Sequence, residues 1–410
     1  MLIKLAWRNL WRNKLRTSII LGAMVFGLTG VIAMMGFMTG FVDSMISNAI
    51  RWQTSHIQIH EQKYVTNSDI SDQIPNGQTL AESIRALDDV TAVSARFIAQ
   101  GMIASARSNR GVQINGIDLV NEAKITPLSS HITQGEWLDN TGRNPILVSE
   151  KMAERLKLRI GSKVVLTFTD VEGEVAGAAY RVRGMFATPS TSFDEGKVFV
   201  RKSDLQHTAS MHGVHEIAIL VSDVDKISLV EEEIKALLDF ASNSSQLSIR
   251  DWQRIQPMLA TMMSTMDVSN QVILVIFVVA MMFGIINIML MSVFERTQEF
   301  GVLMAVGMQK HKIFSLIMFE TTLLGVTGAS LGIFVSIALV TLMNSVGISL
   351  ASMSEGFGAY GVDTLLRPRV SAREYSMIFT TVFVASVLAA IYPARQILKQ
   401  RPVEAMAEKS

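Results

Sequence analysis

Phe294-Glu295-Arg296-Thr297-Gln298-Glu299-Phe300-Gly301-Val302-Leu303-Met304-Ala305-Val306-Gly307 is the stretch around which the chain is organised, and it joins two long apolar segments. Its charges come first, and a mostly apolar run follows that ends at a glycine. Glu295 and Glu299 are four residues apart, so on one helix they would share a face, while Arg296 would lie off it.

The apolar part of the stretch has helical spacing. Val302, Leu303 and Val306 would lie on one side of a short helix. Gly301 and Gly307 leave room for a turn or for the close approach of another backbone. The pattern predicts a short amphipathic helix at a membrane surface, and the alternative is a solvated loop between two membrane helices.

The composition indicates a membrane protein. The chain has 410 residues, of which 49% are hydrophobic and only 18% are charged, which is too apolar for an ordinary soluble protein. The net charge of +1 implies no strongly charged partner, and we expect no nucleic acid. The sequence has no cysteine, which excludes disulfides and thiolate metal sites.

Four segments are long and apolar enough to cross the roughly 30 Å hydrocarbon core of a bilayer. They are Ser18–Val42, Gln271–Phe294, Ile313–Ser349 and Ser376–Ala394. Lysine and arginine crowd the N-terminus, the loop after the second segment and the C-terminal tail. The positive-inside rule therefore places both termini and this loop in the cytoplasm, and residues 54–250 outside.

The N-terminus carries a regular basic stripe. Lys4, Arg8, Arg12 and Arg16 recur every four residues, with Lys14 between them, and no acid occurs before Ser18. This favours a basic amphipathic helix on an anionic membrane surface, with Trp7 and Trp11 at headgroup depth. The alternative is a simple positive flank of the first membrane helix.

Both helices next to the outer domain are predicted to extend beyond the membrane. A continuous helix from Ser18 to Trp52 would be about 50 Å long, so it should project as a stalk. Asp251–Met266 should form the return stalk. Weak helix-packing signals are the GxxxG pairs at Gly36/Gly40 and Gly328/Gly332.

Residues 54–250 have the pattern of a mixed α+β domain. Strands are predicted at Ser55–His60, Val112–Ile117, Lys163–Thr169, Tyr180–Phe186, Lys197–Val200 and Glu216–Val221, and helices at Thr79–Leu87, Ser149–Leu156 and Ser228–Phe240. His56 and His60 would be about 13 Å apart on a strand, too far to bind one ion, so no metal site is predicted.

Catalytic motifs are missing from the sequence. No GxxxxGK[ST] phosphate loop occurs, so the chain is not expected to bind ATP in that manner. His215-Glu216 lacks the second histidine of HExxH, and no GxSxG occurs. We predict a non-enzymatic chain without a cofactor of its own. Glu320, near one end of the third apolar segment, is either a functional acid or the partner of a lysine or arginine, and the pairing is favoured.

The order of one helix, a large outer domain and three more helices resembles the FtsX-like permeases of MacB and lipoprotein-releasing (LolC/LolE-type) ABC transporters. Three motifs carry the resemblance: Ala6-Trp7-Arg8-Asn9-Leu10-Trp11-Arg12-Asn13-Lys14, the run from Glu295 to Gly307, and Tyr392-Pro393-Ala394-Arg395 with Arg401-Pro402-Val403-Glu404-Ala405-Met406. MacB carries a fused ATPase and this chain shows no phosphate loop, so its layout is closer to the lipoprotein-releasing permeases.

The resemblance implies a bacterial inner-membrane protein with four transmembrane helices and a large extracytoplasmic α+β domain, the MacB-like periplasmic core. Its expected parts are a cytoplasmic amphipathic helix (1–16), the first membrane helix and stalk (17–53), the periplasmic domain (54–250), the return stalk and second helix (251–294), a cytoplasmic coupling loop (295–312), the third helix (313–349), an outer loop (350–374), the fourth helix (375–394) and a cytoplasmic tail (395–410).

In that family the loop after the second helix docks on a separate ATPase, which holds ATP and magnesium. Carried over, the ATPase-coupling residues are Glu295, Arg296, Glu299, Gly301, Ala305 and Gly307. One such permease type captures a periplasmic lipoprotein carrier with a hairpin. The matching tip here is Asp170–Ala178, with Asp170, Glu172 and Glu174, but it is short and has no proline.

Two functions remain open. The first is a permease subunit that extracts lipoproteins or other lipid-anchored substrates, for which methionine-rich helices could adapt to acyl chains. The second is mechanotransmission or efflux of the MacB or FtsX type, acting on a periplasmic partner without moving substrate through the membrane. Expected partners are the ATPase, a second permease copy or homologue, membrane lipids, and a periplasmic carrier or adaptor.

Overall fold

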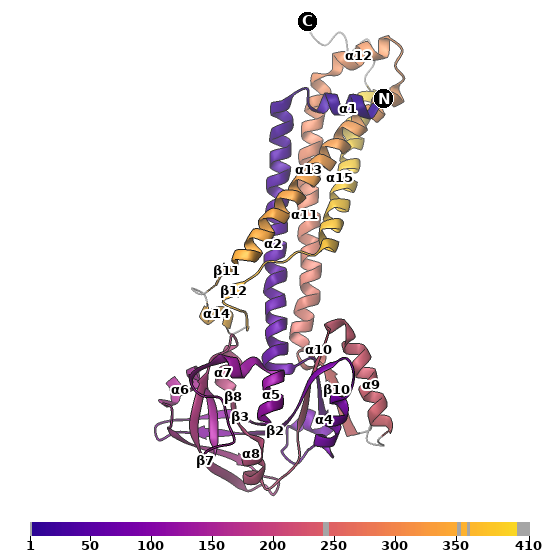
Figure 1. Cartoon of the computed structure of the whole chain (residues 1–410). Helices are drawn as coiled ribbons and strands as arrows, with labels where there is room; N and C mark the ends of the chain where they lie inside the picture. Colours follow the sequence, from indigo (N-terminus) through magenta and orange to yellow (C-terminus); the bar gives the residue numbers. More distant parts are fainter. Residues whose placement is uncertain (1, 241–245, 351–353, 359–360, 400–410) are drawn as a thin grey trace. The chain divides into compact units, whose positions relative to one another are not determined.

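The computed structural model describes residues 2–240, 246–350, 354–358 and 361–399, and the chain divides into two compact units. Unit 1 comprises residues 1–42, 263–348 and 365–410, and unit 2 comprises residues 43–262 and 349–364. Figure 1 gives the labels of the elements. The predicted motif Arg401–Met406 lies outside the described residues.

Unit 1 is helical. It holds α1 (Leu2–Leu10), the first part of α2 (Lys14–Asn48), most of α11 (Pro257–Glu295), α12 (Thr297–Ala305), α13 (Lys310–Val346) and α15 (Ala372–Lys399). In the described part of the chain, four helices are long and apolar enough to cross a membrane: Lys14–Thr54, Pro257–Glu295, Lys310–Val346 and Ala372–Ile397. They confirm the four predicted apolar segments.

The glycines of α13 allow close packing against α2. A Cβ atom at Gly332 would meet Leu28 Cβ at 3.1 Å, and one at Gly328 would meet the Met24 side chain at 2.7 Å. The helices therefore approach each other through a strip without side chains, which confirms the packing prediction for this GxxxG pair.

The GxxxG pair of α2 packs on a different kind of element. A Cβ atom at Gly40 would meet the backbone of Arg367, and the amide of Arg369 donates a 3.0 Å hydrogen bond to the carbonyl oxygen of Gly36. These glycines therefore admit the segment that precedes α15, and this pair does not mark a helix–helix crossing.

The long helices begin and end at identifiable residues. The predicted continuity from Ser18 to Trp52 is confirmed, since α2 runs to Asn48 and continues as the π-helical turn Ala49–Thr54. The predicted return helix from Asp251 is interrupted. Asp251 caps a short helix, α10 (Trp252–Ile255), and α11 starts at Pro257, because proline lacks the N–H that a helix interior requires.

Unit 2 is built on ten strands. They are β1 (Ile57–Glu61), β2 (Val90–Ala104), β3 (Asn109–Ile117), β4 (Ile132–Gly135), β5 (Pro145–Ser149), β6 (Lys163–Thr169), β7 (Val175–Phe186), β8 (Lys197–Arg201), β9 (Glu216–Val221) and β10 (Leu247–Asp251). The six predicted strands each overlap one of these, whereas β2, β4, β5 and β10 were not predicted.

Helices connect and cover these strands. They are α3 (Gln62–Asn67), α4 (Gly77–Arg85), α5 (Leu119–Ile125), α6 (Glu150–Leu156), α7 (Thr191–Gly196), α8 (Lys202–Ala209) and α9 (Ile227–Phe240). α4, α6 and α9 confirm the three predicted helices. Segment 349–364 adds α14 (Ser354–Gly358), and the short strands β11 (Ile348–Ser349) and β12 (Leu365–Leu366) pair with each other.

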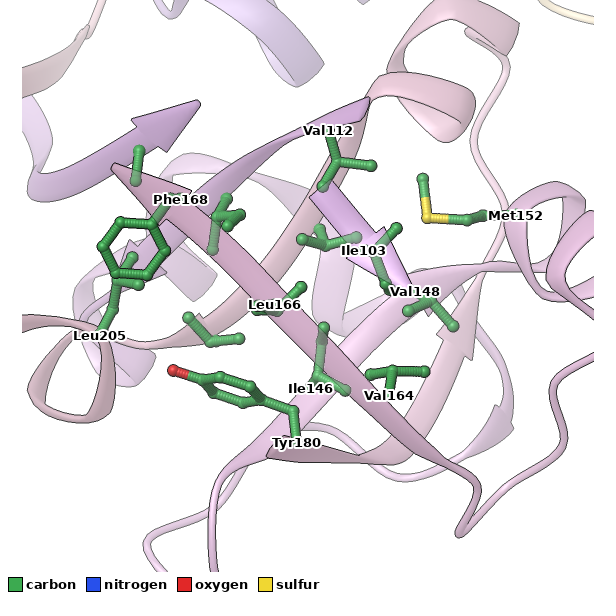
Figure 2. Packing of buried hydrophobic residues seen from close by; sticks show 14 of the residues in the cluster. Ile103, Val112, Ile146, Val148, Met152, Val164, Leu166, Phe168, Tyr180 and Leu205 are labelled. Carbon is green, nitrogen blue, oxygen red and sulfur yellow. The ribbon is translucent and has the colours of Figure 1, made fainter. Parts of the chain in front are cut away.

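Six of the strands close into a barrel. The pairing runs β2–β3–β8–β5–β7–β6 and returns to β2, so these strands form a ring without an open edge. Alternate side chains point inward, and Ile146, Leu166 and Tyr180 are buried in the interior (Figure 2). The barrel is stabilised by this apolar core, in a chain without disulfides.

Strand β2 belongs to two sheets. Its first half pairs with β9, which continues to β1 and β10, and its second half pairs with β3 and β6 in the barrel. Arg96 lies at the change of sheet, is 5% exposed, and contacts Glu122 at 2.6 Å and Glu216 at 2.5 Å. Buried charged groups require partners of opposite charge, and Arg96 is the partner of both Glu122 and Glu216.

Candidate functional site

Helix α12 is the short helix predicted between two membrane segments. It starts after Arg296, whose φ of −103° and ψ of 14° break the helical path, so α11 ends at Glu295. Glu295 and Glu299 therefore lie on different helices, and the predicted common helical face is wrong. The break turns the chain between the two helices.

The other end of α12 is closed by Gly307. Its φ is +98°, a region that favours glycine. The amide of Gly307 donates to the carbonyl oxygen of Met304 at 3.0 Å, and the amide of Met308 donates to that of Leu303 at 2.9 Å. This pair of bonds is a Schellman motif, so Gly307 ends the helix through its backbone conformation.

The two faces of α12 differ in burial. Thr297, Phe300 and Gly301 are buried on the inner face. On the outer face, Val302 is 54% exposed and Val306 is 83% exposed. Four exposed residues, Gln298, Val302, Ala305 and Val306, therefore form the outer face of the helix. An exposed apolar strip of this kind on a short helix suits contact with another protein.

The charged residues of the stretch form a chain of ion pairs. Arg296 contacts Glu299 at 3.0 Å and Glu320 of α13 at 3.1 Å. Arg12 contacts Glu299 at 2.9 Å, and Arg16 of α2 pairs with Glu295. α12 is thus linked through charges to the segment between α1 and α2 and, through Arg296, to α13, while the start of α2 is linked to the end of α11.

These contacts change the acidity of Glu299. Partial burial would raise its pKa, but hydrogen bonds from Arg12 and Arg296 outweigh this effect and lower the pKa below its ordinary value. Glu299 therefore stays ionised at neutral pH and keeps both arginines as partners.

The structure places the six predicted coupling residues in two groups. Glu295, Glu299, Ala305 and Gly307 are exposed. Arg296 and Gly301 face the helix bundle, where Arg296 also lies over the Phe300 ring at 5.2 Å.

Glu320 has the basic partner that was favoured from the sequence. Its side chain is 7% exposed and its carboxylate accepts two hydrogen bonds from Arg296, each at 3.1 Å. The contacts of Arg12 and Arg16 with the stretch were not predicted from the sequence. The sequence shows basic residues at the N-terminus and two acids, Glu295 and Glu299, in the stretch. This pattern does not indicate which arginine pairs with which acid.

The predicted hairpin is present in unit 2 as β6 and β7. The carboxylate of Asp170 accepts from the amides of Glu172 and Glu174, both at 3.0 Å, and Gly173 has a φ of +81°. Asp170 therefore stabilises the turn, and Glu172 and Glu174 are the exposed acids of the tip. Ala178, the last residue of the predicted tip, lies inside β7 and packs on the barrel core.

The histidines considered for a metal are used in hydrogen bonds. His60 Nδ1 donates to the His215 carbonyl oxygen at 2.9 Å, and His56 Nδ1 accepts from the Val221 amide at 2.9 Å. In the described residues no group of three metal-binding side chains is found.

Comparison with known proteins identifies two modules. The MacB-like periplasmic core domain family matches residues 17–237, which is more than half of the chain, and the FtsX-like permease C-terminal family matches residues 271–402. The solved periplasmic region of MacB from Actinobacillus actinomycetemcomitans is 13% identical, with a TM-score of 0.39, and the match covers 53% of this chain and 97% of that one.

Curated relatives match over nearly the whole chain. The pyoverdine export ATP-binding/permease protein PvdT of Pseudomonas fluorescens Pf-5 is 23% identical over 98% of this chain and 59% of its own length. The macrolide export ATP-binding/permease protein MacB of Chlorobaculum tepidum is 25% identical over 98% of this chain and 60% of its own length. The chain thus spans about three-fifths of these relatives, and it belongs to the FtsX-like permeases with a MacB-like periplasmic core domain, which are multi-pass membrane proteins of ABC transporters.

Proposed function

We propose that this chain is the permease subunit of an ABC transporter that extracts lipoproteins or other lipid-anchored substrates from the bacterial inner membrane. A separate ATPase chain holds ATP and magnesium and drives the cycle. The observation that supports this most is the outer face of α12, where Val302, Ala305 and Val306 are exposed between charged residues. Both termini and α12 lie in the cytoplasm in this proposal, as the basic flanks indicate.

The predicted coupling residues have two roles in this proposal. Glu295, Glu299, Ala305 and Gly307 contact the ATPase, because they are exposed. Arg296 and Gly301 hold the helix against the bundle, because Arg296 pairs with Glu320 and Gly301 is buried. Val302 and Val306 join the contact, although they were not among the predicted coupling residues.

The other partners follow from exposed surfaces. On α2, Phe26 is 83% exposed, and on α11, Phe283 is 65% exposed. These apolar surfaces suit lipid or a second permease copy. The exposed acids Glu172 and Glu174 at the hairpin tip would contact a periplasmic carrier or adaptor.

A second function has specific support. Two relatives of the chain are named as macrolide and pyoverdine exporters. The alternative is therefore efflux or mechanotransmission of the MacB or FtsX type, in which the periplasmic domain drives an adaptor and no substrate crosses the membrane through this chain. Proteoliposomes with permease and ATPase separate the two. ATP-dependent release of an acylated lipoprotein supports the first function, and its absence together with binding of an adaptor supports the second.

The docking role of α12 is tested by copurification of the ATPase at matched permease levels. Gly307→Leu places a branched side chain at positive φ, which costs roughly 1–2 kcal/mol and shifts the end of the helix. We expect this variant and Val302→Glu to release the ATPase. The matched controls are Gly307→Asn, which tolerates this backbone region better, and Val224→Glu in unit 2, where the valine is 51% exposed. Equal ATPase recovery in all variants would remove the coupling assignment.

A further inference from the structure

We propose that Arg12 and Arg16 are positioning residues that hold α12 in the orientation required for docking. This inference rests on the proposed function, because it concerns the same helix, and it adds the segment between α1 and α2 to the coupling apparatus.

The segment that carries these arginines is fixed in place. Ala6 is fully buried and Leu10 is 6% exposed, and both belong to the hydrophobic cluster that contains Ile313 and Leu316 of α13. The hydroxyl of Thr17 donates to the Leu10 carbonyl oxygen at 2.5 Å across the turn. The start of α2 is therefore anchored by its own turn and by an apolar cluster that also includes Phe300 of α12.

The ion pairs connect this anchor to both sides of the break at Arg296. Arg12 approaches Glu299 through two nitrogens, at 2.9 and 3.1 Å to different carboxylate oxygens, which is the bidentate geometry that fixes orientation. Arg16 pairs with Glu295, the last residue of α11. One anchor thus contacts the end of α11 and the first turn of α12.

Helix α12 needs this support. It has nine residues, and an isolated helix of that length is marginal in water. Its buried residues are Thr297, Phe300 and Gly301, and Leu303 and Met304 pack, partly buried, against the same apolar cluster. The ion pairs of Glu299 in its first turn add directional contacts to this apolar packing.

Other basic residues of the N-terminal segment behave differently. Lys4, Arg8 and Lys14 form no ion pair with any residue that the structure describes, so they remain available for anionic lipid headgroups. The basic residues of this segment thus divide into three without an acidic partner in the described structure and two arginines that contact acids of the coupling stretch.

The test uses amide hydrogen exchange of residues 297–305 in the full-length permease, with and without the ATPase. Arg16→Glu places two acids together, and we expect exchange of α12 to rise about threefold, with partial loss of ATPase. The swap Arg16→Glu with Glu295→Arg should restore slow exchange of α12, because the ion pair is re-formed and each new charge also suits the dipole of its helix end. ATPase recovery is compared only between wild type, Arg16→Glu and Lys14→Glu, because Glu295 itself lies in the proposed ATPase contact. Lys14→Glu is the matched control, with the same change of charge in the same turn, and should resemble wild type. Arg16→Gln replaces Arg16→Glu if that variant does not fold.

The outcomes are distinct. The positioning role is overturned if α12 exchange is unchanged in Arg16→Glu, or if Lys14→Glu has an equal effect. It is also overturned if the swap does not restore slow exchange of α12, and each of these results would favour general attraction to lipid. If exchange of α12 becomes faster in Arg16→Glu and the swap reverses this change, the positioning role is supported. If ATPase recovery is nevertheless the same in wild type and Arg16→Glu, docking by α12 is overturned.

Discussion

At the residue scale, the Arg296–Glu320 pair is the most buried charge contact of unit 1 that the structure describes. Their side chains are 12% and 7% exposed. Removing one member of such a pair leaves an uncompensated charge, which costs about 3–5 kcal/mol, whereas replacing both by apolar residues is often nearly neutral.

We therefore predict that Glu320→Ala lowers the thermal unfolding midpoint of the permease in detergent. The double variant Glu320→Leu with Arg296→Met should recover most of the loss. If Glu320→Ala unfolds at the wild-type temperature, the pair is hydrated and contributes little, as exposed pairs do.

A second residue-scale prediction concerns pH. Burial lowers the pKa of His60 and of His215, so both are neutral when folded, whereas unfolding lets them bind protons below about pH 6.5. The unfolded state then binds more protons, and stability falls as pH decreases through this value. The pKa of Glu216 would be raised by burial, but the charge of Arg96 lowers it overall, so its contribution is lost only at more acidic pH.

We expect the unfolding midpoint of the full chain to drop between pH 7 and pH 5.5, by the equivalent of about 1 kcal/mol for each of the two histidines. His60→Gln should show a smaller drop over the same interval. A midpoint that is flat over this range, or that rises on acidification, contradicts the assignment of neutral buried histidines.

At the scale of elements, the end of α2 is joined to the segment between α13 and α15. Asn48 is 4% exposed and its amide donates to the Gly361 carbonyl oxygen at 2.8 Å and to Asp363 at 3.1 Å. The Asp363 amide donates to the Ser44 hydroxyl oxygen at 3.1 Å. The segment 349–364 thus belongs to unit 2 through contacts that its own sequence pattern does not reveal.

We predict that Asn48→Pro abolishes transport while ATPase binding survives, because an interior proline costs about 3 kcal/mol and breaks the helix. Asn48→Ala keeps the helix and removes only the side-chain bonds, so it should reduce transport less. Normal transport by the proline variant would mean that residues 43–54 act as a loose linker.

At the scale of the whole molecule, the proposal requires the hairpin tip and α12 on opposite sides of the membrane. The chain has no cysteine, so single cysteines report their own positions. Gly173→Cys should react with an impermeant thiol reagent in intact cells, and Gln309→Cys should react only after lysis. Glu172→Cys is the control for Gly173, whose positive φ disfavours a side chain. The reverse labelling pattern would overturn the topology.

The sequence by itself determined the local features of this protein. The four membrane helices follow from apolar runs of sufficient length, whereas the break before Pro257 was not predicted. Strands such as β6 and β9 show the expected alternation or apolar run. The turn at Gly307 also follows, because a glycine after an apolar helical run is a stop signal.

Only the tertiary structure decided the pairings between distant residues. Strand β2 was not predicted, because its alanine, serine and glycine have low strand propensity and its stability comes from three neighbouring strands. The ring that closes through β6 depends on the same pairings. Arg12 and Glu299 are 287 positions apart, and no local pattern links them. Periodicity reports which face of an element is buried, but the partner on that face is selected by the packing of the whole chain.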